Sequence, residues 1–213
     1  AYKDNKLSTY LSNYSITDIL IDSYGFLWAA TSQEGIFLYD NGKWYHYFNF
    51  EGLPFDVVYC IMEDREKNIW LGSISGAAKI SYRQILIFSE VEGLENLYVN
   101  SIYQKRDGTL WIGYRGGISK FEPEKLTFLK IEDEKLKKVI VRAICEDLDG
   151  NLLLGTHDDG LFIMKGRDIY PILLDGKKQL DRIYNMHFIP IKGTYIATKK
   201  GFYLWNGKEI SGF

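Results

Sequence analysis

The chain has 213 residues, of which 46% are hydrophobic and 15% aromatic, and this composition excludes a disordered chain and supplies a continuous core for one or two domains. The formal net charge is −2 and no segment concentrates Lys or Arg, which excludes the basic footprint that nucleic acid requires. No apolar run approaches the roughly 18 residues of a membrane span, and the chain opens without signal-peptide character, so we expect a soluble chain.

One motif, a turn followed by an apolar strand, recurs along the chain. The aromatic or apolar residue that marks each copy is Trp28, Trp70, Trp111, Leu153 or Tyr195. Successive copies lie 41 or 42 residues apart, which is the length of one four-stranded propeller blade. The repeat therefore predicts an all-β fold, a β-propeller of five four-stranded blades.

The predicted organisation is an N-terminal segment, residues 1–14, followed by five repeats at about residues 15–55, 56–97, 98–138, 139–181 and 182–213. Linkers are expected at residues 51–53 and 92–94. Two arrangements stay open: a closed ring, or five blades of a larger propeller. Residues 6–11 could supply a closing strand, although residues 208–213 already give the last blade an outer strand.

The third repeat shows the predicted blade most clearly. Its strands are expected at residues 99–105, 110–113, 117–121 and 126–131, with an Asp-Gly hairpin turn between the first two. The second strands of several repeats are apolar on both faces, at residues 26–30, 69–72 and 152–155. A strand of this kind lies in a sheet packed between two others, as in radially arranged blades.

The two cysteines, Cys60 and Cys145, fall in first strands of the second and fourth repeats. These repeats are not neighbours in a propeller, so we expect two unbridged, buried thiols. Three recurring aspartates, Asp22, Asp64 and Asp147, are predicted to accept backbone N–H groups in the hairpin turns. We assign them no catalytic role.

Residues 107–113, Asp-Gly-Thr-Leu-Trp-Ile-Gly, followed by Gly117 and Ile118, make the chain resemble the two-component regulator propeller repeat. Residues 64–72 and 22–31 match this pattern well, and the fourth and fifth copies match it less closely. The resemblance implies a non-catalytic sensor module, as in the periplasmic or extracellular part of bacterial hybrid two-component systems. Many of those proteins sense oligosaccharides, and most carry more repeats together with membrane and kinase parts.

In a propeller, the turns between second and third strands share one face with the loops between blades, and this face commonly binds ligands. The candidate ligand-binding residues on these turns are Gln33, Glu34, Tyr114, Arg115, His157, Asp158 and Lys199. We expect Tyr114 to offer a stacking surface, Arg115 a bidentate donor, and His157 and Asp158 orienting hydrogen bonds to a hydroxyl-rich or anionic ligand. The alternative is that these turn residues are polar because they meet water.

No cofactor, metal site or catalytic motif is predicted. Consecutive residues such as 157–159 seldom converge on one ion, and residues 147–151 lack the downstream Glu of a calcium loop. Two other functions stay open. One is protein docking or homodimerisation through Tyr45, Tyr47 and Phe48 of an outer strand. The other is a propeller lyase or glycoside hydrolase that uses loop carboxylates such as Glu34 and Asp158.

Overall fold

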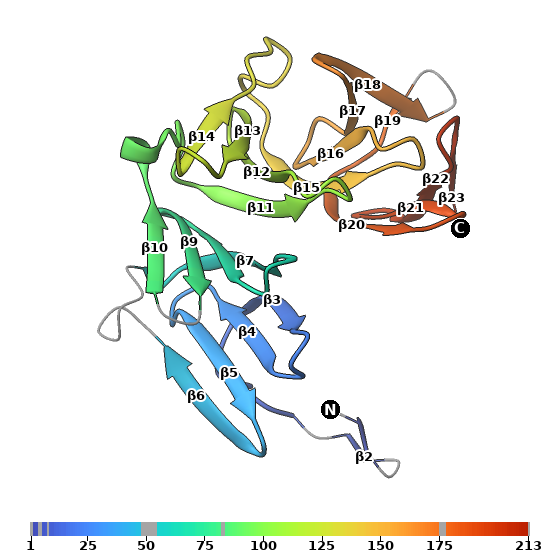
Figure 1. Cartoon of the computed structure of the whole chain (residues 1–213). Coiled ribbons are helices and arrows are strands. Elements are labelled where there is room, and N and C mark those ends of the chain that lie inside the picture. The colour runs from blue at the N-terminus through green and yellow to red at the C-terminus, as the bar shows by residue number, and fades with distance from the viewer. Residues whose placement is uncertain are drawn as a thin grey trace.

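Five antiparallel sheets follow one another in the computed structural model, which describes residues 2–3, 6–7, 9–47, 55–81, 84–174 and 178–212 (Figure 1). The first blade contains β3 (Ile16–Ile21), β4 (Leu27–Thr31), β5 (Ile36–Asp40) and β6 (Lys43–Tyr47). The second contains β7 (Val58–Glu63), β8 (Ile69–Ser73), β9 (Gly76–Ser81) and β10 (Gln84–Phe88), and a 3-10 helix, η2 (Glu90–Glu92), follows it.

The three later blades repeat this order. The third contains β11 (Val99–Gln104), β12 (Leu110–Tyr114), β13 (Gly117–Glu122) and β14 (Thr127–Lys130). The fourth contains β15 (Val141–Glu146), β16 (Leu152–Thr156), β17 (Leu161–Lys165), β18 (Asp168–Leu174) and the short β19 (Lys178–Gln179). The fifth contains β20 (Ile183–Ile189), β21 (Gly193–Thr198), β22 (Gly201–Trp205) and β23 (Ile210–Gly212). The predicted all-β propeller of five blades is confirmed.

The repeated aspartates shape the hairpin turns between first and second strands. Asp22 accepts the backbone N–H groups of Tyr24 and Phe26, and its second oxygen accepts the indole N–H of Trp28 at 2.8 Å. Asp64 holds Trp70 in the same way at 2.7 Å. Asp147 accepts the backbone N–H groups of Asp149 and Asn151, so the predicted role of the three aspartates as turn acceptors is confirmed. Asp22 and Asp64 also fix the tryptophan of their blade.

The second strands of the three middle blades lie in the core. Every residue of β8, β12 and β16 is buried. The apolar character of these strands on both faces is thus explained by blades that pack radially against each other, as predicted. Cys60 and Cys145 are free and buried, which confirms the expectation of two unbridged thiols.

A β-bulge interrupts the innermost strand of every blade, close to its start. The register with the second strand shifts between Ile16 and Asp18 in β3, and equivalent shifts occur in β7, β11, β15 and β20. A bulge adds one unpaired residue and re-aims its side chain. The five bulge residues are Thr17, Tyr59, Asn100, Arg142 and Tyr184. This feature was not predicted from the sequence.

The innermost strands pack in succession, β3 on β7, β7 on β11, β11 on β15 and β15 on β20. Comparable packing of β20 on β3 is not found among the described residues, and Figure 1 shows the first blade (blue) and the fifth (red) at the two ends of an arc. The first and fifth blades therefore each leave one flank without a neighbouring blade.

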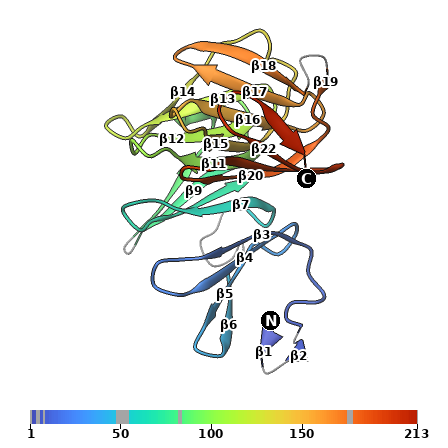
Figure 2. The same ribbon diagram turned by 90° about the vertical axis from the view of Figure 1, so that its right-hand side faces the viewer.

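The N-terminal segment does not close the ring. Its strands β1 (Tyr2–Lys3) and β2 (Lys6–Leu7) pair only with each other in a separate two-stranded sheet, which lies beside β5 and β6 (Figure 2). The outer strand of the fifth blade is β23, from its own repeat. Residues 6–11 could have supplied a closing strand, but no pairing with the fifth blade is found for them among the described residues, and residues 6–7 pair locally. The predicted linker at residues 51–53 lies outside the described residues.

Candidate functional site

The turns between second and third strands meet the loops between blades at one end of the sheets, which we call the loop face. Backbone N–H groups of the turn glycines donate to carbonyls just ahead of the next blade: Gly35 to Asp56 at 2.6 Å, Gly76 to Leu97 at 2.8 Å and Gly116 to Val139 at 2.8 Å. These bonds link neighbouring blades. These bonds therefore hold the turns of the loop face, and the side chains that they carry, in place relative to the next blade.

Tyr114 is not part of that surface. Only 1% of its area is exposed, and its hydroxyl lies 2.8 Å from Ser119 Oγ inside the core, so the expected stacking role is wrong. The residue is the last of β12, where other blades have a hydroxyl side chain that donates to the carbonyl of the turn glycine, as in Thr31, Ser73 and Thr156. That alignment is the sequence signal that could have identified Tyr114 as a core residue.

Three other candidates are exposed on the loop face. Gln33 and Glu34 lie in the turn of the first blade, where the Glu34 carbonyl is 2.6 Å from Nε2 of His46. Arg115 lies in the turn of the third blade, and its carbonyl accepts from Asn96 Nδ2 at 3.0 Å. Their side chains stay accessible to a ligand.

His157 and Asp158 form a cluster between the fourth and fifth blades, together with a residue that sequence reasoning missed. Nδ1 of His157 lies 2.6 Å from Asp158 Oδ2, and Arg182 Nη2 donates to Asp158 Oδ1 at 3.0 Å. The His157 ring and the Arg182 guanidinium hold the pKa of Asp158 below its ordinary value. Lys199, also exposed, is tied to the same loop because its N–H donates to the Arg182 carbonyl at 2.9 Å.

The five bulge residues line a cavity of about 380 Å³ around the propeller axis, which we call the axial pocket. All five innermost strands contribute to it, near the end where they leave the loop face. Its lining joins the phenol rings of Tyr59 and Tyr184 to the side chains of Asn100 and Asn185. The pocket therefore has the aromatic and polar character that the sequence led us to expect on the turns.

Two opposite charges define the electrostatics of the axial pocket. The Arg142 guanidinium lies 5.8 Å from the ring centre of Tyr184, which is 47% exposed. Asp18 accepts the N–H of Ile61 in the next blade at 3.0 Å, and burial raises the pKa of its carboxyl despite that bond. Ser101 adds a buried hydroxyl for which the described residues supply no hydrogen-bond partner. A bound carboxylate or hydroxyl group would pair with the Arg142 guanidinium.

Bulge residues carry no common residue type, so nothing in the sequence marks them as a set. The predicted residues and the axial pocket share the loop-face end of the blades. Within the described part of the chain, no three His, Cys, Asp or Glu residues are grouped as a metal site would require. No helix among the described residues is long and apolar enough to cross a membrane.

A family model described as two component regulator propeller matches residues 10–33, 52–75 and 93–116. These segments cover the first two strands of the first three blades. Histidine kinase P4 from Formosa agariphila is 32% identical over 80 residues, which are 34% of this chain and 6% of that protein. The chain thus spans a small part of the curated relative that it matches.

Solved structures show the same fold at low identity. The extracellular domain of BT3049 from B. thetaiotaomicron, described as a hybrid two component system, has a TM-score of 0.81 and 23% identity over 95% of this chain and 28% of its own. Virginiamycin B lyase from Staphylococcus aureus has a TM-score of 0.70 and 14% identity over 93% of this chain and 69% of its own. At these identities the likeness concerns the fold alone.

Proposed function

The first three blades carry two-component regulator propeller repeats, and on that premise we propose that the chain is a non-catalytic ligand-recognition module of a sensor protein. The proposal places it outside the cytoplasm, as the BT3049 domain is extracellular, and makes an oligosaccharide or another small hydroxyl-rich molecule its ligand. We infer no lyase activity from the similarity to virginiamycin B lyase, because the two chains are only 14% identical.

The observation that carries the proposal is the axial pocket. Tyr184 offers an exposed ring, Arg142 a cation beside it, and Asn100 and Asn185 hydrogen-bonding groups around the same axis. Aromatic faces stack on the apolar faces of sugar rings, and amides and guanidinium groups pair with hydroxyl and carboxylate groups. The exposed loop-face residues Gln33, Glu34, Arg115, His157, Asp158 and Lys199 would extend contacts from the pocket to a longer ligand.

Thermal unfolding with a panel of neutral and acidic oligosaccharides tests the proposal. A ligand at about 100 times its Kd adds about 2.7 kcal/mol to the free energy of unfolding. We expect a selective upward shift in Tm that Arg142→Ala and Tyr184→Ala abolish. Arg167→Ala, a change at an exposed arginine of the fourth blade, should leave the shift intact. An unshifted Tm across the panel would exclude oligosaccharides as ligands of this pocket.

Protein docking is a second candidate, and the unpaired flanks favour it. Ile19 and Ile21 on the first blade are 65% and 72% exposed, and Phe202 on the fifth is 62% exposed. The N-terminal segment covers part of the first flank, where Tyr14 lies 4.7 Å from Phe37. We propose a partner with an apolar β-sheet face. Concentration-dependent association in sedimentation experiments that Ile21→Glu weakens would support it, and a monomer at all concentrations would exclude self-association.

A further inference from the structure

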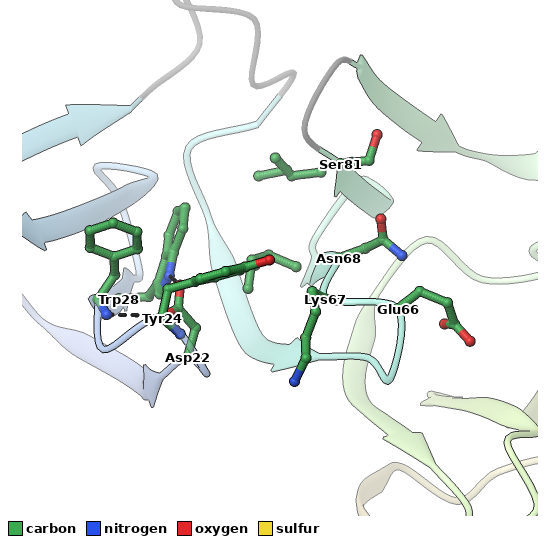
Figure 3. Close-up of a pocket in the computed structure, with 10 residues that line it drawn as sticks. Asp22, Tyr24, Trp28, Glu66, Lys67, Asn68 and Ser81 are labelled. Carbon is green, nitrogen blue, oxygen red and sulfur yellow. Dashed lines mark hydrogen bonds between the residues drawn. The ribbon is translucent and has the colours of Figure 1, made fainter.

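A groove of about 840 Å³ separates the first and second blades at the end opposite to the loop face. Its first wall is the hairpin turn between β3 and β4, and its second is the corresponding turn between β7 and β8 together with the end of β9. Figure 3 shows Tyr24 extending from the first turn across the groove toward the turn that carries Lys67. The groove shares no lining residue with the axial pocket.

The first wall is aromatic only in this blade. Tyr24 and Phe26 occupy turn positions that the next three blades fill with polar residues: Glu66 and Asn68, Asp107 and Thr109, and Asp149 and Asn151. Tyr24 is 71% exposed although it lies in a turn that Asp22 holds rigidly. An exposed aromatic ring at a position where the repeat prefers polar residues is a surface suited to stacking rather than to core packing.

Trp28 extends this wall, because it is less covered than its counterparts. Trp70 and Trp111 are 1% and 6% exposed, and the Lys79 ammonium lies over Trp70 at 5.4 Å from the ring centre. Leu38 takes the place of Lys79 opposite Trp28, which is only half-buried. The groove between the first two blades is accordingly larger than that between the second and third, about 840 against 520 Å³.

The second wall supplies one cation in an unusual position. Lys67 has a φ of 68°, in the left-handed region, where three of the other turns have Gly25, Gly108 and Gly150 with φ between 80° and 89°. A side chain at such a position is unfavourable and is often tied to function. Among the described residues, the Lys67 ammonium forms no ion pair, although it lines the groove. Its charge is therefore available to a ligand.

Of the other polar groups that line the groove, Asp22 and Asn68 are already engaged, and the Glu66 carboxylate points away from Tyr24 (Figure 3). Asp22 accepts from Trp28 Nε1, and the Asn68 amide donates to both carboxylate oxygens of Asp64 at 3.0 and 2.9 Å. Recognition must then come from the Tyr24 face, the Tyr24 hydroxyl and the Lys67 ammonium. These groups match a molecule with one flat apolar face and one carboxylate.

We propose that this groove binds a small carboxylate whose flat face stacks on Tyr24 and whose carboxylate pairs with Lys67. An acidic sugar ring and an aromatic acid share this chemistry. The site is separate from the axial pocket and does not depend on the function proposed for it.

Isothermal titration with three probes tests the proposal: a triuronate, a neutral trisaccharide of the same length, and phenylacetate. We expect the triuronate, phenylacetate or both to bind, the neutral trisaccharide to bind at least tenfold more weakly, and Tyr24→Ala to lower the affinity at least tenfold. Lys67→Gly should do the same without unfolding the protein, because glycine suits the left-handed conformation. Comparison of the two acids identifies which source of the carboxylate the groove prefers.

Two controls keep the groove distinct from other sites. Lys165→Ala removes an exposed lysine of the fourth blade and should leave binding unchanged. Arg142→Ala disables the axial pocket and should also leave it unchanged. The proposal is overturned if neither acid binds, if the neutral sugar binds equally well, or if Lys67→Gly keeps full affinity. Loss of acid binding in Arg142→Ala with retention in Lys67→Gly would assign the ligand to the axial pocket instead.

Discussion

Lys67 has a backbone conformation that glycine adopts at the same position in three other blades. We can therefore predict whether its replacement by glycine raises or lowers the free energy of unfolding. The left-handed conformation costs an L-residue roughly 1–2 kcal/mol. Glycine avoids this cost because it has no Cβ, but its greater freedom in the unfolded chain offsets part of the gain. We expect Lys67→Gly to raise the free energy of unfolding by about 1 kcal/mol in urea denaturation. Gly25→Ala is the reverse control: φ is 87° and an added Cβ would meet no atom within 4 Å, so a loss of about 1 kcal/mol would isolate the backbone effect.

The thiol of Cys145 links stability to alkaline pH. Burial raises its pKa from 9.0 to about 11, so the unfolded chain loses this proton at lower pH than the folded protein. The neutral thiol therefore contributes roughly 3 kcal/mol to the free energy of unfolding below pH 9, and this contribution is lost as the pH rises from 9 to 11. We expect the decline in stability between these values to be smaller in Cys145→Ala, measured by urea denaturation at each pH. Equal slopes in both proteins would contradict the assignment.

At the scale of strands and turns, neighbouring blades are joined by a repeated hydrogen bond. A side chain at the end of an innermost strand accepts a backbone N–H from the hairpin turn of the blade before it. Glu63 accepts from Ser23 at 2.9 Å, Gln104 from Arg65 at 2.9 Å, and Glu146 from Arg106 at 2.7 Å. The sequence repeat thus encodes contacts between blades as well as the blades themselves.

Glu146 is the member of this series with the largest expected effect. It is 2% exposed, and its carboxylate also lies 3.4 Å from Nε of Arg106. Because the Arg106 side chain is half exposed, removal of Glu146 leaves no buried charge, but it does leave the backbone N–H of Arg106 without its acceptor, which costs about 1–3 kcal/mol. We expect a loss of that order for Glu146→Ala in chemical denaturation. Glu146→Gln should lose clearly less, because Gln104 forms the same bond in the preceding blade, and an equal loss in both variants would show that the hydrogen bond contributes little.

At the scale of the whole molecule, the sheets could be predicted because turn residues repeat in phase with the strands. Residue type alone indicates the structural role of these positions: aspartate and glycine indicate the turns, and continuous apolar residues indicate the buried strands β8, β12 and β16. The axial pocket could not be predicted in this way, since Thr17 and Arg142 share a bulge position and no chemical property. Tyr114 was misplaced for a related reason: its type indicates a surface ring, whereas its position in the repeat requires burial.

Because the first blade has one uncovered flank, equivalent isoleucines of the first and second blades should contribute differently to the free energy of unfolding. Ile19 and Ile61 occupy the same position of the first and second blades, yet they are 65% and 7% exposed. Replacement of a buried isoleucine by alanine costs about 2–5 kcal/mol, whereas an exposed one costs within about 0.5 kcal/mol. We therefore expect Ile61→Ala to destabilise the protein strongly and Ile19→Ala hardly at all in urea denaturation of the dilute chain.

The same pair of variants reports whether the first flank is covered in solution. If Ile19→Ala costs as much as Ile61→Ala, another surface must bury Ile19, and the open arc would not describe the chain in water. If the cost of Ile19→Ala grows with protein concentration, that surface belongs to a second copy, because only association makes stability depend on concentration. A small cost at every concentration means that the flank stays exposed, and the fold is then held together by the contacts between successive blades alone.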